Sequence, residues 1–218
     1  MTIRKRFFAI ASLFMLIFCG KLSALDSKLV IIRHGEGEHN QLHIYSTWTQ
    51  EEGGVDHPLT EKGKLQVAKT AQKLFEQGFN RETVGLVLVS PLLRTRQTAQ
   101  ILVDKGICSE KMIFLEERIR EPRAQDWEGA STPPKQPHED RWTAIVEASA
   151  LHRGETVKAI EQRLESVLTK LSQWDPAKGH VILVTHGYPS QILLKIYGEK
   201  NTHVDTGEAR ILPLKLPD

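Results

Sequence analysis

Three short polar segments of this chain carry side chains suited to phosphoryl chemistry. They contain Arg33 with His34, Arg94, and His186, and each follows an apolar run typical of a buried strand. Because the carboxyl ends of parallel strands meet at one edge of a sheet, we expect these side chains to lie close together. The sequence therefore predicts a site that combines two imidazoles with two guanidinium groups.

This combination favours an oxyanion over a metal ion as the ligand. Arginines repel cations, whereas the planar guanidinium fork binds phosphate oxygens in pairs. Arginines also disfavour protonation of a neighbouring imidazole, which then stays nucleophilic near neutral pH. Such an imidazole can attack a phosphoryl group and form a phosphohistidine while the cations hold the phosphoryl oxygens.

The leaving oxygen of a phosphate ester needs a proton, and our candidate donor is Glu121 in the segment Ile-Arg-Glu-Pro at 119–122. Glu36 and Glu38 follow His34 closely, so either is an alternative acid or substrate contact. We interpret His39 as a structural or exposed residue.

Alternating strand and helix patterns place these residues on a sheet. Apolar runs bounded by turn signals alternate with helical periods, which predicts βαβ units, a mainly parallel sheet and the α/β class. Thr60 is a suitable N-cap for the first long helix, and Pro213 favours an edge position for the last strand. Strands are expected at 28–32, 84–89, 112–115, 180–185 and 209–216, and helices at 60–78, 92–103, 155–174 and 189–197.

The first 24 residues resemble a secretory signal peptide. A basic cluster at 4–6 precedes a 13-residue apolar run at 7–19, and Ser23 and Ala24 form a small-residue exit. A spanning helix needs about 20 apolar residues. We therefore expect export to a periplasm or to the outside of the cell, with no stable membrane association after cleavage. If cleavage fails, the segment would act as a membrane anchor.

The remaining chain, 25–218, has the size of one domain. Its Pro- and Trp-rich stretch at 122–151 is expected to form a lid or insertion over the site. The whole chain carries 29 Lys and Arg against 27 Asp and Glu. The segment 1–24 contains four of the cations and no acid, so the rest is near neutral and bulk charge gives no indication of nucleic-acid binding. The expected partner is a small phosphorylated substrate. The sequence does not indicate an oligomeric state.

Several short motifs of this chain resemble, in order, those of the histidine phosphatase superfamily, in its phosphoglycerate mutase-like branch. Gln125 departs from the family pattern because Gly is usual there. The matching elements are Arg33-His34-Gly35, Asn40, Leu59-Thr60 with Gly63, Ser90-Pro91 with Arg94 and Thr98-Ala99, Ile119 with Glu121, Trp127-Glu128-Gly129, Gly154-Glu155-Thr156 and His186-Gly187.

The resemblance implies a three-layer αβα sandwich with a mainly parallel central sheet. It also implies that His34 is the phosphorylated nucleophile, that Glu121 donates the proton, and that His186 completes the catalytic set. Arg33, Asn40 and Arg94 would bind phosphate, without a metal or organic cofactor.

The expected function is metal-independent hydrolysis of phosphomonoesters. A phosphoglycerate mutase-type phosphotransferase and an inactive phosphate-binding domain are the alternatives.

Overall fold

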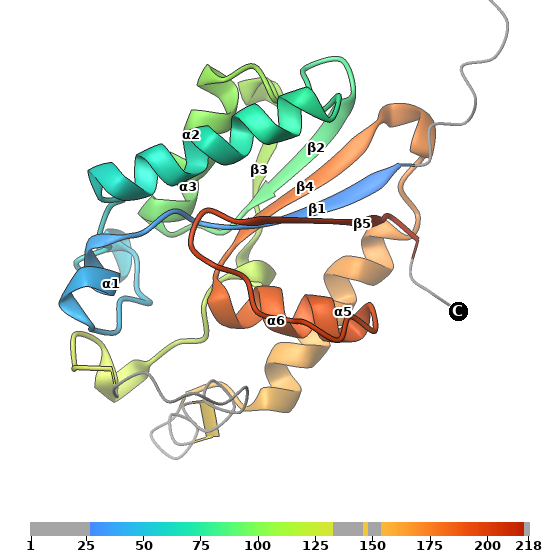
Figure 1. Cartoon of the computed structure of the whole chain (residues 1–218). Coiled ribbons are helices and arrows are strands. Elements are labelled where there is room, and N and C mark those ends of the chain that lie inside the picture. Colours follow the sequence, from blue (N-terminus) through green and yellow to red (C-terminus); the bar gives the residue numbers. More distant parts are fainter. Residues whose placement is uncertain (1–26, 133–145, 148–153, 216–218) are drawn as a thin grey trace, which may run out of the picture.

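The computed structural model describes residues 27–132, 146–147 and 154–215 (Figure 1). The predicted signal peptide and most of the 122–151 insertion lie outside these residues. Within the described part of the chain, no helix is both long and apolar enough to cross a membrane.

Five strands form one sheet in the order β3-β2-β4-β1-β5. The first four in that order run parallel, and β5 pairs antiparallel with β1 at the edge. The predictions of a mainly parallel sheet and of an edge position for the last strand are therefore confirmed. The strands are β1 (Lys28–Arg33), β2 (Val84–Val89), β3 (Ile113–Leu115), β4 (His180–Thr185) and β5 (Ala209–Pro213).

Helices cover both faces of this sheet, which confirms the three-layer αβα arrangement. Figure 1 shows α2 and α3 on one face and α5 and α6 on the other, with the short α1 beyond one end of the strands. The α-helices are α1 (Glu38–Leu42), α2 (Glu61–Glu76), α3 (Leu93–Asp104), α5 (Val157–Leu171) and α6 (Gly187–Ile196). The 3-10 helices are η1 (Gln50–Glu52), η2 (Glu110–Met112), η3 (Glu117–Ile119), η4 (Gln125–Trp127) and η5 (Pro176–Lys178).

The predicted element ends differ from the observed ones for local reasons. The Thr60 hydroxyl accepts the Gly63 N–H at 3.0 Å and begins α2 as predicted, but α2 ends at Glu76 before Gly78, whose φ is +90°. The helix expected at 155–174 begins only at Val157, because Thr156 is its N-cap and accepts the Ala159 N–H.

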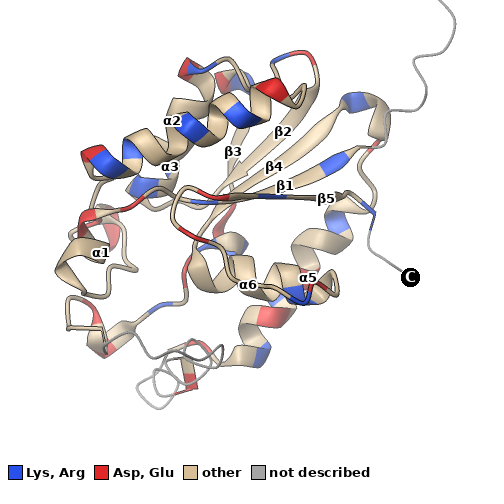
Figure 2. Cartoon of the chain, viewed as in Figure 1, with Lys and Arg blue, Asp and Glu red and all other residues tan. Residues whose placement is uncertain are grey.

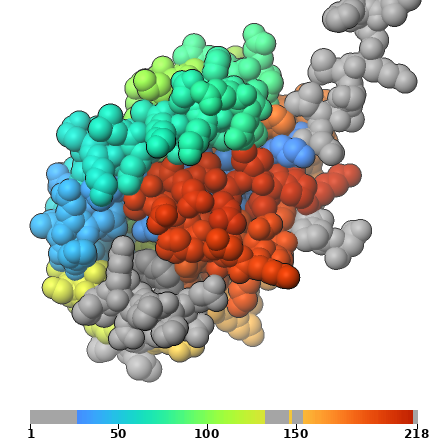
Figure 3. Space-filling model, in the orientation of Figure 1, coloured from blue at the N-terminus to red at the C-terminus, as the bar shows by residue number. Residues whose placement is uncertain are grey.

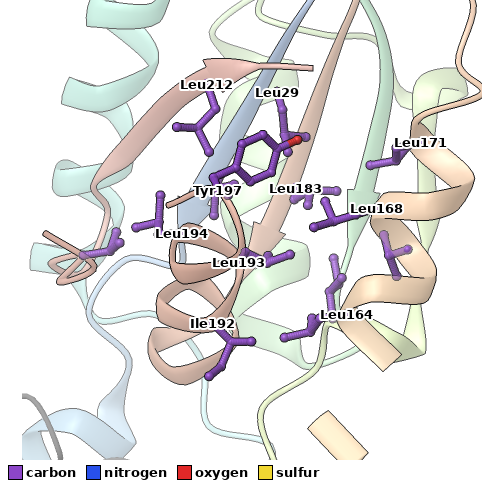
Figure 4. Close-up of a cluster of buried hydrophobic side chains, with 14 of the residues drawn as sticks. Leu29, Leu164, Leu168, Leu171, Leu183, Ile192, Leu193, Leu194, Tyr197 and Leu212 are labelled. Carbon is purple, nitrogen blue, oxygen red and sulfur yellow. The ribbon is translucent and has the colours of Figure 1, made fainter. Parts of the chain in front are cut away.

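Successive side chains of the strands point to opposite faces of the sheet and pack in two separate apolar cores. Val181 and Leu183 of β4 join the core under α5 and α6, whereas Ile182 and Val184 join the core under α2 and α3. Figure 4 shows the first core, in which Leu164, Leu168 and Leu171 of α5 lie against the sheet. Lys, Arg, Asp and Glu lie mostly on helices and connecting segments (Figure 2).

The segment before β5 is hydrogen-bonded to the end of β1. Gly207, with φ +75°, donates its N–H toward the carbonyls of Arg33 and His34, at 3.1 and 2.8 Å. Its own carbonyl accepts the Thr70 hydroxyl from α2. Figure 3 shows α2 packed directly on this C-terminal part of the chain. On the other side the His34 N–H binds the Thr185 carbonyl of β4 at 3.0 Å, so the end of β1 is held from both sides.

Candidate active site

His34 lies just beyond the carboxyl end of β1 and is 2% exposed. Its Nδ1 lies 2.6 Å from the Gly35 carbonyl oxygen, which can only accept, so Nδ1 carries the proton of the neutral ring. The lone pair is then on Nε2, which lies 3.2 Å from Nε of Arg94. The ring is therefore held in the tautomer that a nucleophile at Nε2 requires.

The turn after His34 requires glycine because two backbones meet there. A Cβ on Gly35 would lie 2.3 Å from the carbonyl oxygen of Gly63, in the first turn of α2. A Cβ on Gly63 would in turn lie 2.0 Å from the Glu36 carbonyl oxygen. This contact explains why glycines stand at both positions, and it fixes the Gly35 carbonyl that orients His34.

Arg94 is the principal cation of the site. It lies in the first turn of α3, is 1% exposed, and its Nη1 is buried without a hydrogen-bond partner in the described part of the chain. Burial lowers its pKa to about 10, so it remains charged at neutral pH. Asp56 fixes the start of α3 by accepting the Leu93 N–H at 2.8 Å. A buried cation with an unused donor at a helix N-terminus is suited to an oxyanion.

His186 directly follows β4. It is the N-cap residue of α6 and is fully buried. Its ring centroid lies 5.1 Å from that of His34, at an interplanar angle of 64°. The hydroxyl of Ser90, which follows β2, lies 2.7 Å from its Nε2. Three parallel strands thus deliver His34, Ser90 and His186 to the same edge of the sheet, as the sequence predicts for the two histidines.

The imidazoles of His34 and His186 are neutral. Burial holds the pKa of each well below 6.5, and the nearby Arg94 guanidinium lowers it further. For His34 the Arg33 guanidinium acts in the same direction. His34 is therefore available as a nucleophile without first losing a proton.

Glu121 lies next to His186, with Oε2 3.8 Å from Nδ1 of that ring. Its side chain is 14% exposed, and burial raises its pKa above 4.5 despite the opposing effects of Arg94 and Arg33. The raised pKa shifts this carboxyl toward its protonated form, which is the form that a proton donor uses.

The other two carboxylates near His34 in sequence are placed differently. Glu36 binds Lys62 at 2.7 Å and accepts the Thr60 hydroxyl at 3.1 Å, and these contacts lower its pKa. Glu38 is exposed at the first position of α1. These contacts favour Glu121 over Glu36 and Glu38 as the acid.

The two remaining predicted phosphate ligands make backbone contacts. Nη1 of Arg33 donates to the Val204 carbonyl at 2.9 Å, and Arg33 acts electrostatically on His34. Oδ1 of Asn40 accepts the Gly37 N–H at 2.9 Å. The NH₂ group of the Asn40 side chain is not used in this bond and can donate to another acceptor.

The structure adds a third imidazole that the sequence interpretation placed elsewhere. The His39 ring centroid lies 5.5 Å from that of His34, and Nδ1 of His39 is buried. Burial and Arg94 hold its pKa well below 6.5. The only sequence signal for His39 was its position five residues after His34. That spacing alone does not establish that the two rings lie close together.

Gln125, at the position where the family pattern has glycine, adopts a backbone conformation that favours glycine. Its φ is +51°, in the left-handed region. Glycine would adopt this conformation without steric cost.

Comparison with known proteins shows the family to which the chain belongs. The family model of the histidine phosphatase superfamily (branch 1) matches residues 29–206, and the chain belongs to that superfamily. Proteins named probable phosphoglycerate mutase GpmB, from Yersinia enterocolitica and Erwinia tasmaniensis, are 28% and 26% identical to it over 171 residues. Each alignment covers 77% of this chain and 73% of the relative.

Solved structures share the fold. TTHB049 from Thermus thermophilus superposes with a TM-score of 0.58 and 24% identity, covering 84% of this chain and 91% of the other. A protein described as mycobacterial hydrolase 1 gives a TM-score of 0.62 and 20% identity, with coverages of 85% and 88%.

Proposed function

We propose that the protein hydrolyses phosphomonoesters through a phosphohistidine on His34. The observation that carries the proposal is the state of His34 itself. Its Nδ1 is anchored on the Gly35 carbonyl, and its Nε2 faces Arg94, whose Nη1 is buried and has no partner in the described residues. A phosphoryl group placed there would meet a nucleophile and a cation together.

The first step transfers the phosphoryl group to the enzyme. His34 Nε2 forms a bond to phosphorus as the bond to the ester oxygen breaks, and Glu121 gives its proton to the departing alcohol. The Gly35 carbonyl, which accepts the Nδ1–H, stabilises the positive charge that develops on the ring. Arg94 and Arg33 balance the charge of the equatorial oxygens.

The second step releases inorganic phosphate. Glu121, now ionised, takes a proton from water as that water attacks phosphorus and the P–N bond breaks. His34 returns to its neutral tautomer, and Glu121 is again protonated. The acid of the first step is thus the base of the second, and the cycle needs no metal ion.

Phosphate release from p-nitrophenyl phosphate tests the proposal, measured with excess chelator and beside the His34→Ala variant. We expect turnover that survives the chelator and falls to background in the variant. Turnover that survives in His34→Ala would contradict the phosphohistidine, and loss with chelator would contradict metal independence. Phosphate release by neither protein would favour a phosphotransferase or an inactive binding domain.

The names of the relatives support a second candidate, a phosphoglycerate mutase-type phosphotransferase. Here the phosphohistidine would return its phosphoryl group to another hydroxyl of the same compound. Incubation with 3-phosphoglycerate separates the two activities. A mutase would yield 2-phosphoglycerate without free phosphate, whereas a phosphatase would release phosphate.

We also propose that residues 1–24 direct export, on the basis of their basic cluster and apolar run. Mass spectrometry of the protein from fractionated cells tests this. A form beginning at residue 25 outside the cytoplasm is expected, and a full-length cytoplasmic form would contradict export.

A further inference from the structure

The backbone that leads to Glu121 is held by side chains from two distant elements. Thr185, the last residue of β4, donates its hydroxyl proton to the Ile119 carbonyl at 2.5 Å. Arg163 of α5 donates from Nη1 to the Arg118 carbonyl at 2.5 Å and from Nη2 to the Arg120 carbonyl at 2.9 Å. Three successive carbonyls before Glu121 are therefore bound by side chains.

The Arg163 guanidinium is itself oriented by a carboxylate. Its Nε lies 2.8 Å from Oε1 of Glu155 and its Nη2 lies 3.1 Å from Oε2, a two-pronged pairing. The Arg163 side chain is 15% exposed. Glu155 belongs to the Gly-Glu-Thr element at 154–156, to which the proposed reaction assigns no step. This pairing gives that element a physical connection to the site.

We propose that Arg163 is the positioning residue of the proton donor, with Glu155 holding its fork in place. The inference rests on the proposed function, in which Glu121 protonates the leaving oxygen. Arg163 binds the carbonyls of Arg118 and Arg120 and thereby sets where Glu121 leaves the backbone. Misplacement of a reacting group by about 1 Å is enough to lower a rate substantially.

Two substrates with different leaving groups test this role. The nitrophenolate of p-nitrophenyl phosphate departs with little help from an acid, whereas the alkoxide of glycerol 2-phosphate must be protonated. We expect Arg163→Gln to lower kcat/KM for glycerol 2-phosphate by about 10- to 100-fold and for p-nitrophenyl phosphate by less than about threefold. A merely structural role would lower both equally.

Two variants separate geometry from charge. Arg163→Lys keeps the cation but lacks the fork that reaches two carbonyls, so the same selective loss is expected. Arg118→Gln is the matched control, because Arg118 lies in the same segment but its side chain pairs with Glu116 and contacts Ser166. It should leave the ratio of the two kcat/KM values unchanged.

If Arg163→Gln leaves the ratio of the two kcat/KM values unchanged, whether both fall equally or neither falls, the positioning role is overturned. Absence of phosphate release by the unaltered protein would instead contradict the proposed function. In that case the ¹³C resonance of the Glu121 carboxyl decides, since it does not depend on turnover. The Arg163 charge itself lowers the Glu121 pKa, so the charge-conserving variant is the one compared. Arg163→Lys should shift the resonance and its titration while Arg118→Gln does not, and an unchanged resonance and titration in Arg163→Lys would overturn the inference.

Discussion

Nε of Arg94 lies 3.2 Å from Nε2 of His34, so the guanidinium donates a hydrogen bond to the atom proposed as nucleophile. The imidazole cannot attack while its lone pair accepts this hydrogen bond. A bound phosphoryl group offers the guanidinium stronger acceptors, because hydrogen bonds between two charged groups exceed those to a neutral nitrogen. We infer that binding of phosphate frees Nε2 at the moment when phosphorus arrives.

Arg94→Met should separate activity from stability. It removes a buried cation whose Nη1 lacks a hydrogen-bond partner among the described residues, and replaces it with an apolar side chain of similar length. We expect kcat/KM for p-nitrophenyl phosphate to fall by about 100-fold or more. The free energy of unfolding in urea, without phosphate, should stay within about 1 kcal/mol of the parent value, because the substitution also removes the cost of burying the guanidinium, the largest effect on the Arg94 pKa.

Arg96→Met is the control for this substitution. Arg96 is exposed on the same helix, and its guanidinium approaches Asp56 only to 3.7 Å. Both measured quantities should change little. A large loss of stability in Arg94→Met would show that Arg94 holds the fold together.

The pH dependence of hydrolysis should report Glu121. The acid must be protonated in the first step, and burial raises its pKa above 4.5, so kcat/KM for glycerol 2-phosphate should fall as the pH rises through that raised pKa. Glu121→Gln should lower kcat/KM for this substrate by about 100-fold and remove the fall. The phosphate group also titrates, near pH 6. A fall that persists in Glu121→Gln therefore belongs to the substrate, and the assignment would be wrong.

The sheet could be predicted because its signals are local. The runs at 28–32, 84–89 and 180–185 are largely apolar, with polar residues only at the ends of the first and last, and turn signals bound each one. The convergence of His34 and His186 follows from this, since both come directly after parallel strands. Glu121 does not follow from any strand pattern, and from the sequence only the family resemblance favoured it over Glu36 and Glu38 as the proton donor.

The rest of the site depends on contacts between distant parts of the chain. His39 reaches His34 because α1 turns back after Gly37, which pairs with Leu59, and the Glu38 N–H binds the Pro58 carbonyl. Arg163 meets the carbonyls of Arg118 and Arg120 across a separation of more than 40 residues. Hydrophobic periodicity places Arg163 on a helix, but it does not reveal which carbonyls the side chain binds.

Replacement of Gln125 by glycine should stabilise the protein. Gln125 has a φ of +51°, a conformation that costs an L-residue about 1 kcal/mol and glycine almost nothing. Because glycine also loses more entropy on folding, the net gain in the free energy of unfolding should be about 0.5 kcal/mol. Gln125→Ala removes the same side chain but keeps Cβ, so it should give no gain. Equal effects of the two variants in urea unfolding would locate the cause in the glutamine side chain.

Acid should destabilise the fold through the three imidazoles of the site. His34, His39 and His186 have pKa values held well below 6.5 in the folded protein, so below pH 6.5 the unfolded chain binds more protons. Their contribution to the free energy of unfolding is complete above pH 6.5. It is lost as the pH falls through the lowered pKa values of the folded protein. The raised pKa of Glu121 acts in the opposite direction, because its contribution is complete below 4.5 and is lost as the pH rises through the raised value.

Urea unfolding of the Glu121→Gln variant at pH 7.5, 6.5 and 5.5 reports the histidines with lowered pKa values, which are the three site imidazoles and His180 outside the site. We expect the free energy of unfolding to change little between pH 7.5 and 6.5 and to fall at 5.5. A further His39→Gln substitution removes one of the titrating groups and should make the fall smaller. If the free energy is unchanged at pH 5.5, or if His39→Gln leaves the fall intact, these imidazoles are not held neutral by burial beside Arg94. The account of His34 as a neutral nucleophile would then lose its electrostatic basis.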